Sequence, residues 1–474
     1  MKTLRQILLT VLVCVCATSA VSAQQRGGGP WSHGKLKVSD NHRYLCYEDG
    51  TPFFWLGDTG WLLPQNLTRS EVGNYLSERA NQGYNVVQVQ VVNGIPNINA
   101  YGQYSFTDTD HFDEIDKPGV YGYWDHVDYI VRTAASRGIY IGMVPTWGGP
   151  VKSGVFSKEG AVAYAKFLAL RYKDSPNIIW LNGGDLNPES TLDVWNAMGQ
   201  MIKQHDPNHL MTFHPIGRTS SVTWFNDAPW LDFNMFQSGH RRYGQMLRRD
   251  GNVPYTGKFQ EEDSWRYVEE AFAKKPQKPV IDGEPSYEGI PQGLHDTDEP
   301  VWQAGDVRRY AYWSVFAGSF GHTYGSSAIM QFTKSGAGGG YGNRMLWTEA
   351  LYLPGAQQLK YLKNLILSVP FFDRIPDQSV LIGNTGERYD RIIATRGNDY
   401  ILAYTYNGCD IEVDLTKISG AKKDAWWMNP RNGEMTYIGS YDGKSARFYP
   451  AGRYRVGNDW VLVVTDASKD YFKK

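Results

Sequence analysis

Residues 177–185 read Asn-Ile-Ile-Trp-Leu-Asn-Gly-Gly-Asp, and this stretch decides the expected fold. Its apolar run lies between polar, proline-containing segments, which predicts a short strand buried on both faces. Such a strand presents polar side chains at its carboxyl end, where Asn182 and Asp185 stand. Residues 278–284, Lys-Pro-Val-Ile-Asp-Gly-Glu, repeat the design and end in Glu284. Two buried strands that each end in an acid predict an α/β protein with a polar site at one edge of its sheet.

Strands alternate with helices on both sides of this stretch. The predicted strands cover residues 52–58, 85–92, 139–145, 177–185, 210–214, 232–237, 278–284 and 321–325. The predicted helices begin with a capping box at residues 68–71 and end with residues 357–367. Eight strand–helix units favour a closed (β/α)₈ TIM barrel over an open, doubly wound sheet. No Gly-x-Gly-x-x-Gly opens a helix after the first strand, so a dinucleotide-binding fold has no support.

The chain divides into three parts by its pattern. Residues 1–23 have basic, apolar and small-residue regions in the order of a signal peptide, and their apolar core is shorter than the ~20 residues of a membrane span. We therefore expect export to the periplasm or the extracellular space, with a lipoprotein anchor disfavoured. Residues 24–370 form the predicted barrel, with a long loop at 93–123.

Residues 371–474 have a different pattern, with short apolar strands separated by turns. The predicted strands cover residues 380–382, 391–394, 400–404, 411–415 and 460–464. Gly-Asn at 397–398, Asn-Gly at 432–433 and Asp-Gly at 442–443 are typical of hairpin turns. The pattern predicts a small antiparallel β-sandwich.

Composition excludes several function classes. The net charge of −1 gives no electrostatic case for nucleic-acid binding. Cys46 and Cys409, which follow the predicted signal peptide, are too few for a disulfide scaffold. No His and Cys cluster has metal-ligand spacing, so we expect neither a metal nor another cofactor.

Asp185 and Glu284 are the predicted catalytic pair. They end the fourth and the seventh strand, which face each other across the mouth of a barrel. Cleavage of a glycosidic bond with retention needs one protonated and one ionised carboxyl group ~5–5.5 Å apart. We assign Asp185 as the acid/base and Glu284 as the nucleophile, although the two roles could be exchanged. Asp58 and Glu288 are weaker candidates for a catalytic acid, and Asp282 is expected to be structural.

Other polar and aromatic residues near strand ends are predicted to contact a sugar, because each buried hydroxyl of a bound sugar needs a partner. These predicted substrate contacts are Asp58, Trp61, Gln88, Gln90, Trp147, Asn182, His214, Gln237, His240, His322 and Tyr324.

Several motifs resemble the apiosidase-like family of glycoside hydrolases. They are residues 53–61, Phe-Phe-Trp-Leu-Gly-Asp-Thr-Gly-Trp, residues 180–185, and residues 278–285. Residues 426–433 resemble the small β-domain, named for collagen binding, that follows the barrel in this family. The resemblance implies that the acid/base is Asp185 and the nucleophile Glu284. It also implies apiosyl linkages of plant cell-wall polysaccharides, notably the pectin rhamnogalacturonan II, as the substrate. The family resembles a larger clan of retaining (β/α)₈ hydrolases, most of which have Asn directly before an acid/base Glu. Here Gly184 precedes the acid, and the acid is the shorter Asp185.

Three alternatives stay open at this point. The same two acids could act on another furanoside or with inversion. The barrel could bind carbohydrate without turning it over. The second domain could mediate matrix adhesion, although residues 371–474 contain no basic or repetitive segment that would favour it.

Overall fold

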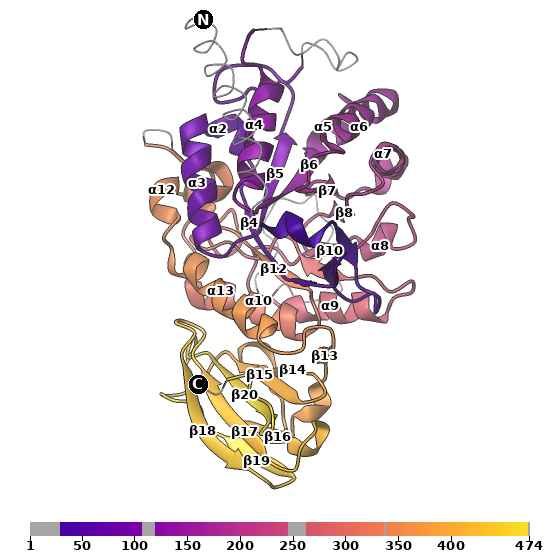
Figure 1. Ribbon diagram of the computed structural model, residues 1–474. Coiled ribbons are helices and arrows are strands. Elements are labelled where there is room, and N and C mark those ends of the chain that lie inside the picture. Colours follow the sequence, from indigo (N-terminus) through magenta and orange to yellow (C-terminus); the bar gives the residue numbers. More distant parts are fainter. Residues whose placement is uncertain (1–28, 107–118, 245–261, 336–337, 473–474) are drawn as a thin grey trace, which may run out of the picture.

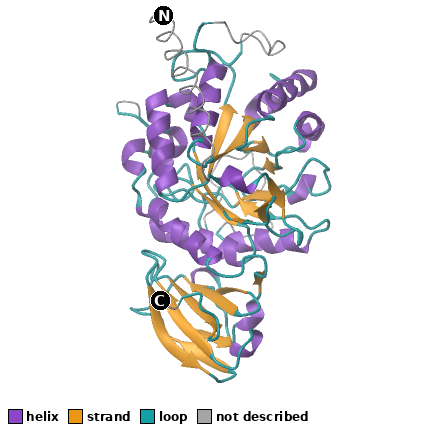
Figure 2. Cartoon of the chain, in the orientation of Figure 1, coloured by secondary structure: helices purple, strands orange, loops and turns teal. Residues whose placement is uncertain are grey.

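The computed structural model describes residues 29–106, 119–244, 262–335 and 338–472. The predicted signal peptide and part of the 93–123 loop lie outside these residues. A barrel of strands and helices forms the larger part of the molecule, and a smaller antiparallel β-domain adjoins it (Figures 1 and 2).

Eight parallel strands form the barrel. In chain order they are β4 (Trp55–Thr59), β5 (Val86–Val92), β6 (Tyr140–Thr146), β7 (Ile178–Gly183), β8 (Met211–His214), β10 (Asn234–Gln237), β11 (Val280–Asp282) and β12 (Gly321–Tyr324). Regular pairing runs β12-β4-β5-β6-β7-β8, and separately β11-β10, where the short β9 (Thr219–Ser220) adds an antiparallel edge. All eight predicted inner strands are thus confirmed.

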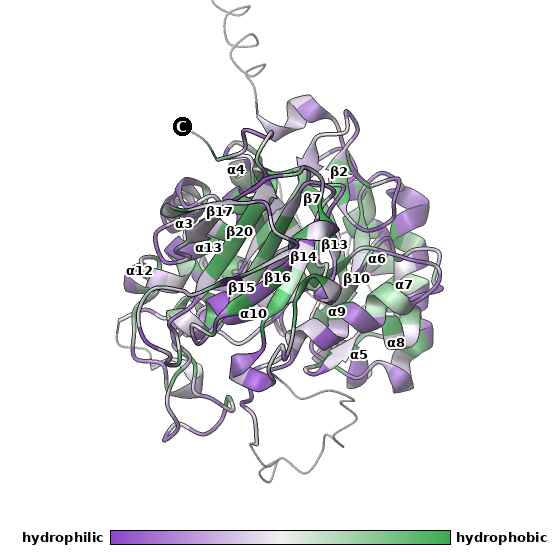
Figure 3. Ribbon diagram, turned by 90° about the horizontal axis from the view of Figure 1, so that it is seen from below, coloured by the Kyte–Doolittle hydropathy of each residue, from purple (hydrophilic) through white to green (hydrophobic). Residues whose placement is uncertain are grey.

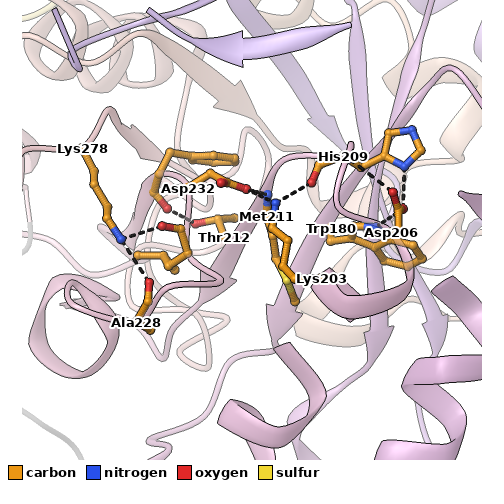
Figure 4. Close-up of polar contacts among 11 residues, drawn as sticks. Trp180, Lys203, Asp206, His209, Met211, Thr212, Ala228, Asp232 and Lys278 are labelled. Atoms are coloured by element: carbon orange, nitrogen blue, oxygen red, sulfur yellow. Dashed lines mark hydrogen bonds and ion pairs between the residues drawn. The ribbon is translucent and has the colours of Figure 1, made fainter. Parts of the chain in front are cut away.

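Isolated hydrogen bonds close the two gaps in this pairing. Between β8 and β10, the Thr212 hydroxyl donates to the Phe233 carbonyl at 2.7 Å, and Asp232 accepts from the Met211 N–H at 2.7 Å. Lys203 donates to the same Asp232 carboxylate, so side-chain hydrogen bonds connect the two segments where strand pairing is missing (Figure 4). Between β11 and β12, the Phe320 N–H donates to the Val280 carbonyl at 3.2 Å. The sheet therefore closes as a (β/α)₈ barrel with two weakly paired seams.

The helices surround the barrel (Figure 1). The long ones are α3 (Arg69–Asn81), α4 (Tyr123–Ala135), α6 (Lys158–Tyr172), α7 (Leu192–His205), α9 (Ser264–Ala273), α10 (Ala304–Phe316) and α13 (Pro354–Leu367). The short ones are α2 (Leu63–Asn66), α5 (Gly148–Lys152), α8 (Val222–Phe225), α11 (Ser327–Gln331) and α12 (Trp347–Ala350). The predicted capping box of α3 is present, with Glu71 accepting from the Thr68 N–H at 2.8 Å. Between β8 and β10 only the single turn α8 stands in place of a full helix. Among the described residues, no helix is long and apolar enough to cross a membrane.

Three short antiparallel strands precede the barrel. They are β1 (Leu36–Val38), β2 (Leu45–Tyr47) and β3 (Pro52–Phe53). The sequence indicates no separate β3, because β3 and β4 read as one strand in residues 52–58. Phe53 packs edge-on against Tyr140 at the start of β6, with ring centroids 5.5 Å apart, so this sheet covers the amino-terminal end of the barrel strands.

The second domain contains two antiparallel sheets. The larger has the order β13 (Ile375–Pro376), β14 (Ile393–Arg396), β15 (Tyr400–Thr405), β20 (Trp460–Asp466), β17 (Lys423–Met428), β18 (Met435–Tyr441). The smaller pairs β16 (Ile411–Asp414) with β19 (Ser445–Phe448). Apolar residues are concentrated on β15 and β20 (Figure 3), and one buried cluster joins both sheets, which confirms the predicted sandwich.

Two details of the predicted sandwich are wrong. Residues 380–382 form no strand, because a 3₁₀ turn (Gln378–Val380) leaves only an isolated bridge between Leu381 and Val413. The Asp-Gly turn at 442–443 does not close a hairpin, because β18 and β19 belong to different sheets. The turn passes the chain from one sheet to the other, and turn composition alone does not distinguish these two uses.

Barrel and sandwich share one continuous core. Tyr312 of α10 stacks on Tyr404 of β15, with ring centroids 4.7 Å apart. Beside them, Arg308 of α10 donates two 2.8 Å hydrogen bonds to the two carboxylate oxygens of Asp459. The sandwich therefore packs directly on a barrel helix.

Candidate active site

Asp185 stands on a turn that follows β7. Gly183, Gly184 and Asp185 all have left-handed backbone conformations, with φ of 86°, 146° and 43°. A Cβ on Gly184 would lie 2.7 Å from the Trp147 ring, and one on Gly183 would lie 2.6 Å from the Phe213 ring. Only glycine fits at these two positions, so the Gly-Gly pair carries the acid beyond the end of the strand.

Backbone hydrogen bonds fix this turn against its neighbours. The Gly184 N–H donates to the His214 carbonyl at 3.0 Å, and the Gly184 carbonyl accepts from the Gly148 N–H at 3.0 Å. The Asp185 N–H points to Nδ1 of His214 at 3.4 Å. The main chain on both sides of β7 thereby holds Asp185.

The Asp185 carboxyl has a raised pKa. The main cause is the surrounding protein, which disfavours the charged form, and the second is the negative charge of Glu284. His214 and hydrogen bonds from Gly217 and Gln237 oppose the shift without cancelling it. The residue itself is exposed to the cavity described below, so we expect water to moderate the first effect. A carboxyl group of this kind keeps its proton to a higher pH than an ordinary aspartate does.

Glu284 follows β11 and has the opposite shift. Its burial alone would raise its pKa, but contacts with His214 and His240 outweigh this and hold the pKa well below its usual range. His240 Nε2 hydrogen-bonds Oε1 at 3.2 Å. His214 Nε2 lies 3.2 Å from Oε2, as a close polar contact without hydrogen-bond alignment. Because Nδ1 of His214 accepts from the Asp185 N–H, a neutral His214 carries its proton on the nitrogen that faces Glu284.

Both acids line one open cavity of about 400 Å³. Its walls come from loops at the carboxyl ends of the barrel strands, which is where barrel enzymes place their sites. The lining residues are Trp61, Leu62, Gln90, Asn93, Trp147, Asp185, Ile216, Gly217, Arg218, Gln237, Gly239, His240, Arg241, Glu284, Leu294, His295, Met330, Gln331 and Tyr341. A second cavity of similar volume lies near the amino-terminal ends of β6 to β8 and contains neither acid.

Six of the predicted substrate contacts lie in or directly behind this cavity. Trp61, Gln90, Trp147, Gln237 and His240 line it. His214 lies behind Trp61 and Trp147, with ring centroids 5.3 and 5.5 Å away. These residues give the cavity an aromatic wall beside amide groups that can bond hydroxyls.

The structure does not bring the other five predicted contacts to the cavity. Four of them point outward, toward the surrounding helices and loops. Asp58 accepts from Arg79 and Tyr75 of α3, both at 2.6 Å, and Asn182 donates to the Trp195 carbonyl of α7 at 2.8 Å. His322 contacts Ser314 of α10, and Tyr324 donates to Glu288 at 2.8 Å. The fifth, Gln88, is fully buried and donates to the Gly283 carbonyl at 2.7 Å.

Several cavity residues were not predicted from the sequence. Arg218, Arg241, His295 and Tyr341 come from loops with no recognisable motif. Tyr287 is outside this lining set but accepts from Nε1 of Trp61 at 2.8 Å; it lies three residues after Glu284 and could have been inferred from that proximity. Leu294, Arg218 and Tyr341 have positive φ values of 68°, 64° and 58°, a strained conformation that is often found at functional sites. Among the described residues, no group of three or more His, Cys, Asp or Glu has a geometry that could hold a metal ion.

Family models and solved structures match most of the chain. Residues 39–373 match the family model "Apiosidase-like, catalytic domain", and residues 375–465 match "Putative collagen-binding domain of a collagenase". No curated protein matches. A solved structure described as a glycoside hydrolase is 60% identical, covers 94% of this chain and 100% of its own, and has a TM-score of 0.91. A family 5 glycoside hydrolase from Bacteroides vulgatus is 58% identical over 94% of this chain and 96% of its own, with a TM-score of 0.90. The chain belongs to the apiosidase-like family and is a glycoside hydrolase.

Proposed function

We propose that the protein is a retaining glycosidase in which Asp185 is the acid/base and Glu284 the nucleophile. The observation that carries this assignment is that two acids lining one cavity have pKa values shifted in opposite directions. Acids whose environments push their pKa values apart are suited to the two different roles of such a reaction.

The reaction then proceeds in two steps. Glu284, ionised and held by His214 and His240, attacks the anomeric carbon. Protonated Asp185 gives its proton to the departing glycosidic oxygen. In the second step, ionised Asp185 takes a proton from water, whose oxygen displaces Glu284 and releases the sugar. The proton on Nε2 of His214 stabilises the charged form of Glu284 before attack.

We propose apiosyl linkages of rhamnogalacturonan II, a plant cell-wall pectin, as the substrate. Membership of the apiosidase-like family supports this choice. The wall formed by Trp61 and Trp147, with ring centroids 5.4 Å apart, offers apolar area to a sugar face. Gln90 and Gln237 each have a buried side-chain oxygen without a partner in the described residues, which could accept from sugar hydroxyls. Export by residues 1–23 would bring the enzyme to such a polymer, and the mature N-terminus measured by mass spectrometry should be Gln24.

The test is incubation with rhamnogalacturonan II fragments, followed by identification of the released sugar and NMR of its first anomer. We expect apiose-containing product with retained configuration. Asp185→Asn and Glu284→Gln should each abolish turnover while binding persists, and Glu412→Gln, in the sandwich, should leave turnover unchanged. Release from a different furanoside only would refute the substrate, and an inverted anomer would refute the role of Glu284. Binding without turnover by the wild type would refute both.

A further inference from the structure

A second buried acid lies two residues before Glu284. Asp282 is the last residue of β11 and has no solvent exposure. Both of its carboxylate oxygens accept from one residue, Ser238. The Ser238 hydroxyl donates to Oδ2 at 2.6 Å, and the Ser238 N–H donates to Oδ1 at 3.3 Å. The Glu284 N–H is a further donor to this carboxyl, and among the described residues Ser238 supplies its one side-chain hydrogen bond. Asp282 thus links the 238–240 segment to the main chain of Glu284.

Ser238 opens the three-residue turn 238–240 that ends in His240. Regular pairing of β10 with β11 ends at Phe236 and Asp282, directly before this turn. Beyond that point the Asp282 side chain continues the connection between the two segments. Two further contacts follow it, from the Gly239 N–H to the Glu284 carbonyl at 3.2 Å and from the Ser286 hydroxyl to the Gly239 carbonyl at 2.8 Å.

The outer side of the turn is held as well. The His240 carbonyl accepts from the Gly293 N–H at 2.8 Å and from Nε1 of Trp302 at 3.0 Å. With its main chain held on both sides, His240 places Nε2 3.2 Å from Oε1 of Glu284. On the inner side, the pair Ser238–Asp282 anchors the start of the turn, and the contacts of Gly239 with Glu284 and Ser286 anchor its middle.

We propose that Asp282 is a positioning residue, which holds Ser238 and thereby the 238–240 turn so that the His240 imidazole stays on Glu284. Asp282 does not touch the substrate and acts through His240. The inference rests on the proposed function only in naming Glu284 as the nucleophile.

The test compares Ser238→Ala, Asp282→Ala and Asp282→Asn in the full chain. Asparagine keeps the size of the side chain and one acceptor oxygen, so it should rescue most of the effect of alanine. Ser319→Ala is the matched control, because Ser319 is equally buried and bonds the carbonyls of Val280 and Gly321, neither of which lines the cavity. It separates a general loss of stability from loss of this particular link.

The measured quantity is the pKa of Glu284. Carbon-13 NMR of its carboxyl reports this pKa in the unliganded protein, and the acid limb of the kcat/KM profile reports it during turnover. Other ionisable groups face Glu284 or share its cavity, and the fit of the Glu284 titration curve must include them. They are His214, His240, Asp185, Asp282, Tyr287, Arg218, Arg241, His295 and Tyr341.

We expect Ser238→Ala and Asp282→Ala to move the Glu284 titration upward by about one pH unit, since His240 then stabilises the carboxylate less. Asp282→Asn should move it less, and Ser319→Ala should not move it. An unchanged titration in Ser238→Ala, or an equal shift in Ser319→Ala, would overturn the proposal. If Asp282→Ala does not fold, Ser238→Ala alone decides. If the protein hydrolyses no apioside, the proposed substrate fails, while the carboxyl titration still decides this inference.

Discussion

Replacing Asp459 by alanine should destabilise the barrel and the sandwich together. Asp459 is fully buried at their interface and accepts two 2.8 Å hydrogen bonds from Arg308, whose side chain is 4% exposed. Tyr404 and Arg431 contact the same carboxylate at 3.2 and 3.1 Å. Alanine leaves the Arg308 guanidinium buried without its counter-charge, and removal of one partner of a buried pair costs about 3–5 kcal/mol.

Urea unfolding, monitored by far-UV circular dichroism and by tryptophan fluorescence, measures this cost. We expect one cooperative transition in the wild type, because the core is continuous across the interface. In Asp459→Ala that single transition should move to lower urea with an unchanged slope.

The matched control is Glu412→Ala in the sandwich. Glu412 pairs with Arg447 at 2.7 Å, but the Arg447 side chain is 53% exposed, so its loss should cost less than about 1 kcal/mol. The reasoning is refuted if Asp459→Ala costs no more than this control. It is also refuted if Asp459→Ala unfolds the sandwich early while the barrel transition stays in place.

Three further predictions concern the site. Glu284→Gln should lower kcat by roughly 10³-fold or more, while calorimetry of substrate fragments shows similar affinity. The profile of kcat/KM against pH should be bell-shaped. Its acid limb should lie below the ordinary glutamate pKa, because Glu284 must be ionised. Its alkaline limb should lie above the ordinary aspartate pKa, because Asp185 must be protonated. An alkaline limb near pH 4 would contradict the assigned roles. Gly184→Ala should lower both kcat and the thermal unfolding midpoint, because the added Cβ would lie 2.7 Å from Trp147. Gly149→Ala is the control, because a Cβ there meets nothing within 4 Å, and it should change neither kcat nor the midpoint by a comparable amount.

The sequence predicts the barrel strands well because each is buried on both faces. Such strands appear as apolar runs whatever their neighbours are, and β7 and β11 are buried throughout. The sandwich strands are harder to assign. β18 is mostly exposed or half-buried along its length, and neither it nor β17 was predicted. Pairing between sheets depends on contacts far apart in the chain, which local pattern does not contain.

Five of the predicted substrate contacts lie away from the cavity, and the main cause is the direction of alternate side chains. A position near the end of a barrel strand can point into the mouth or outward to the helices, and neighbours alternate. Asp58 and Asn182 lie near strand ends but point to α3 and α7. A one-residue uncertainty in where a strand leaves the sheet reverses the predicted direction of the side chain. Gln88 fails for a different reason, since it is buried below the cavity.

The same alternation explains why Asp185 needs two glycines before it. Asn182 points outward to α7, and the left-handed Gly183-Gly184 turn then carries the chain over the mouth. There the Asp185 N–H meets Nδ1 of His214, whose Nε2 lies 3.2 Å from Glu284. One imidazole ring thus contacts the backbone of one acid and the carboxylate of the other. Because the turn that places Asp185 also fixes the tautomer of His214, the position of the acid and the His214 contribution to the charge of the nucleophile depend on the same turn.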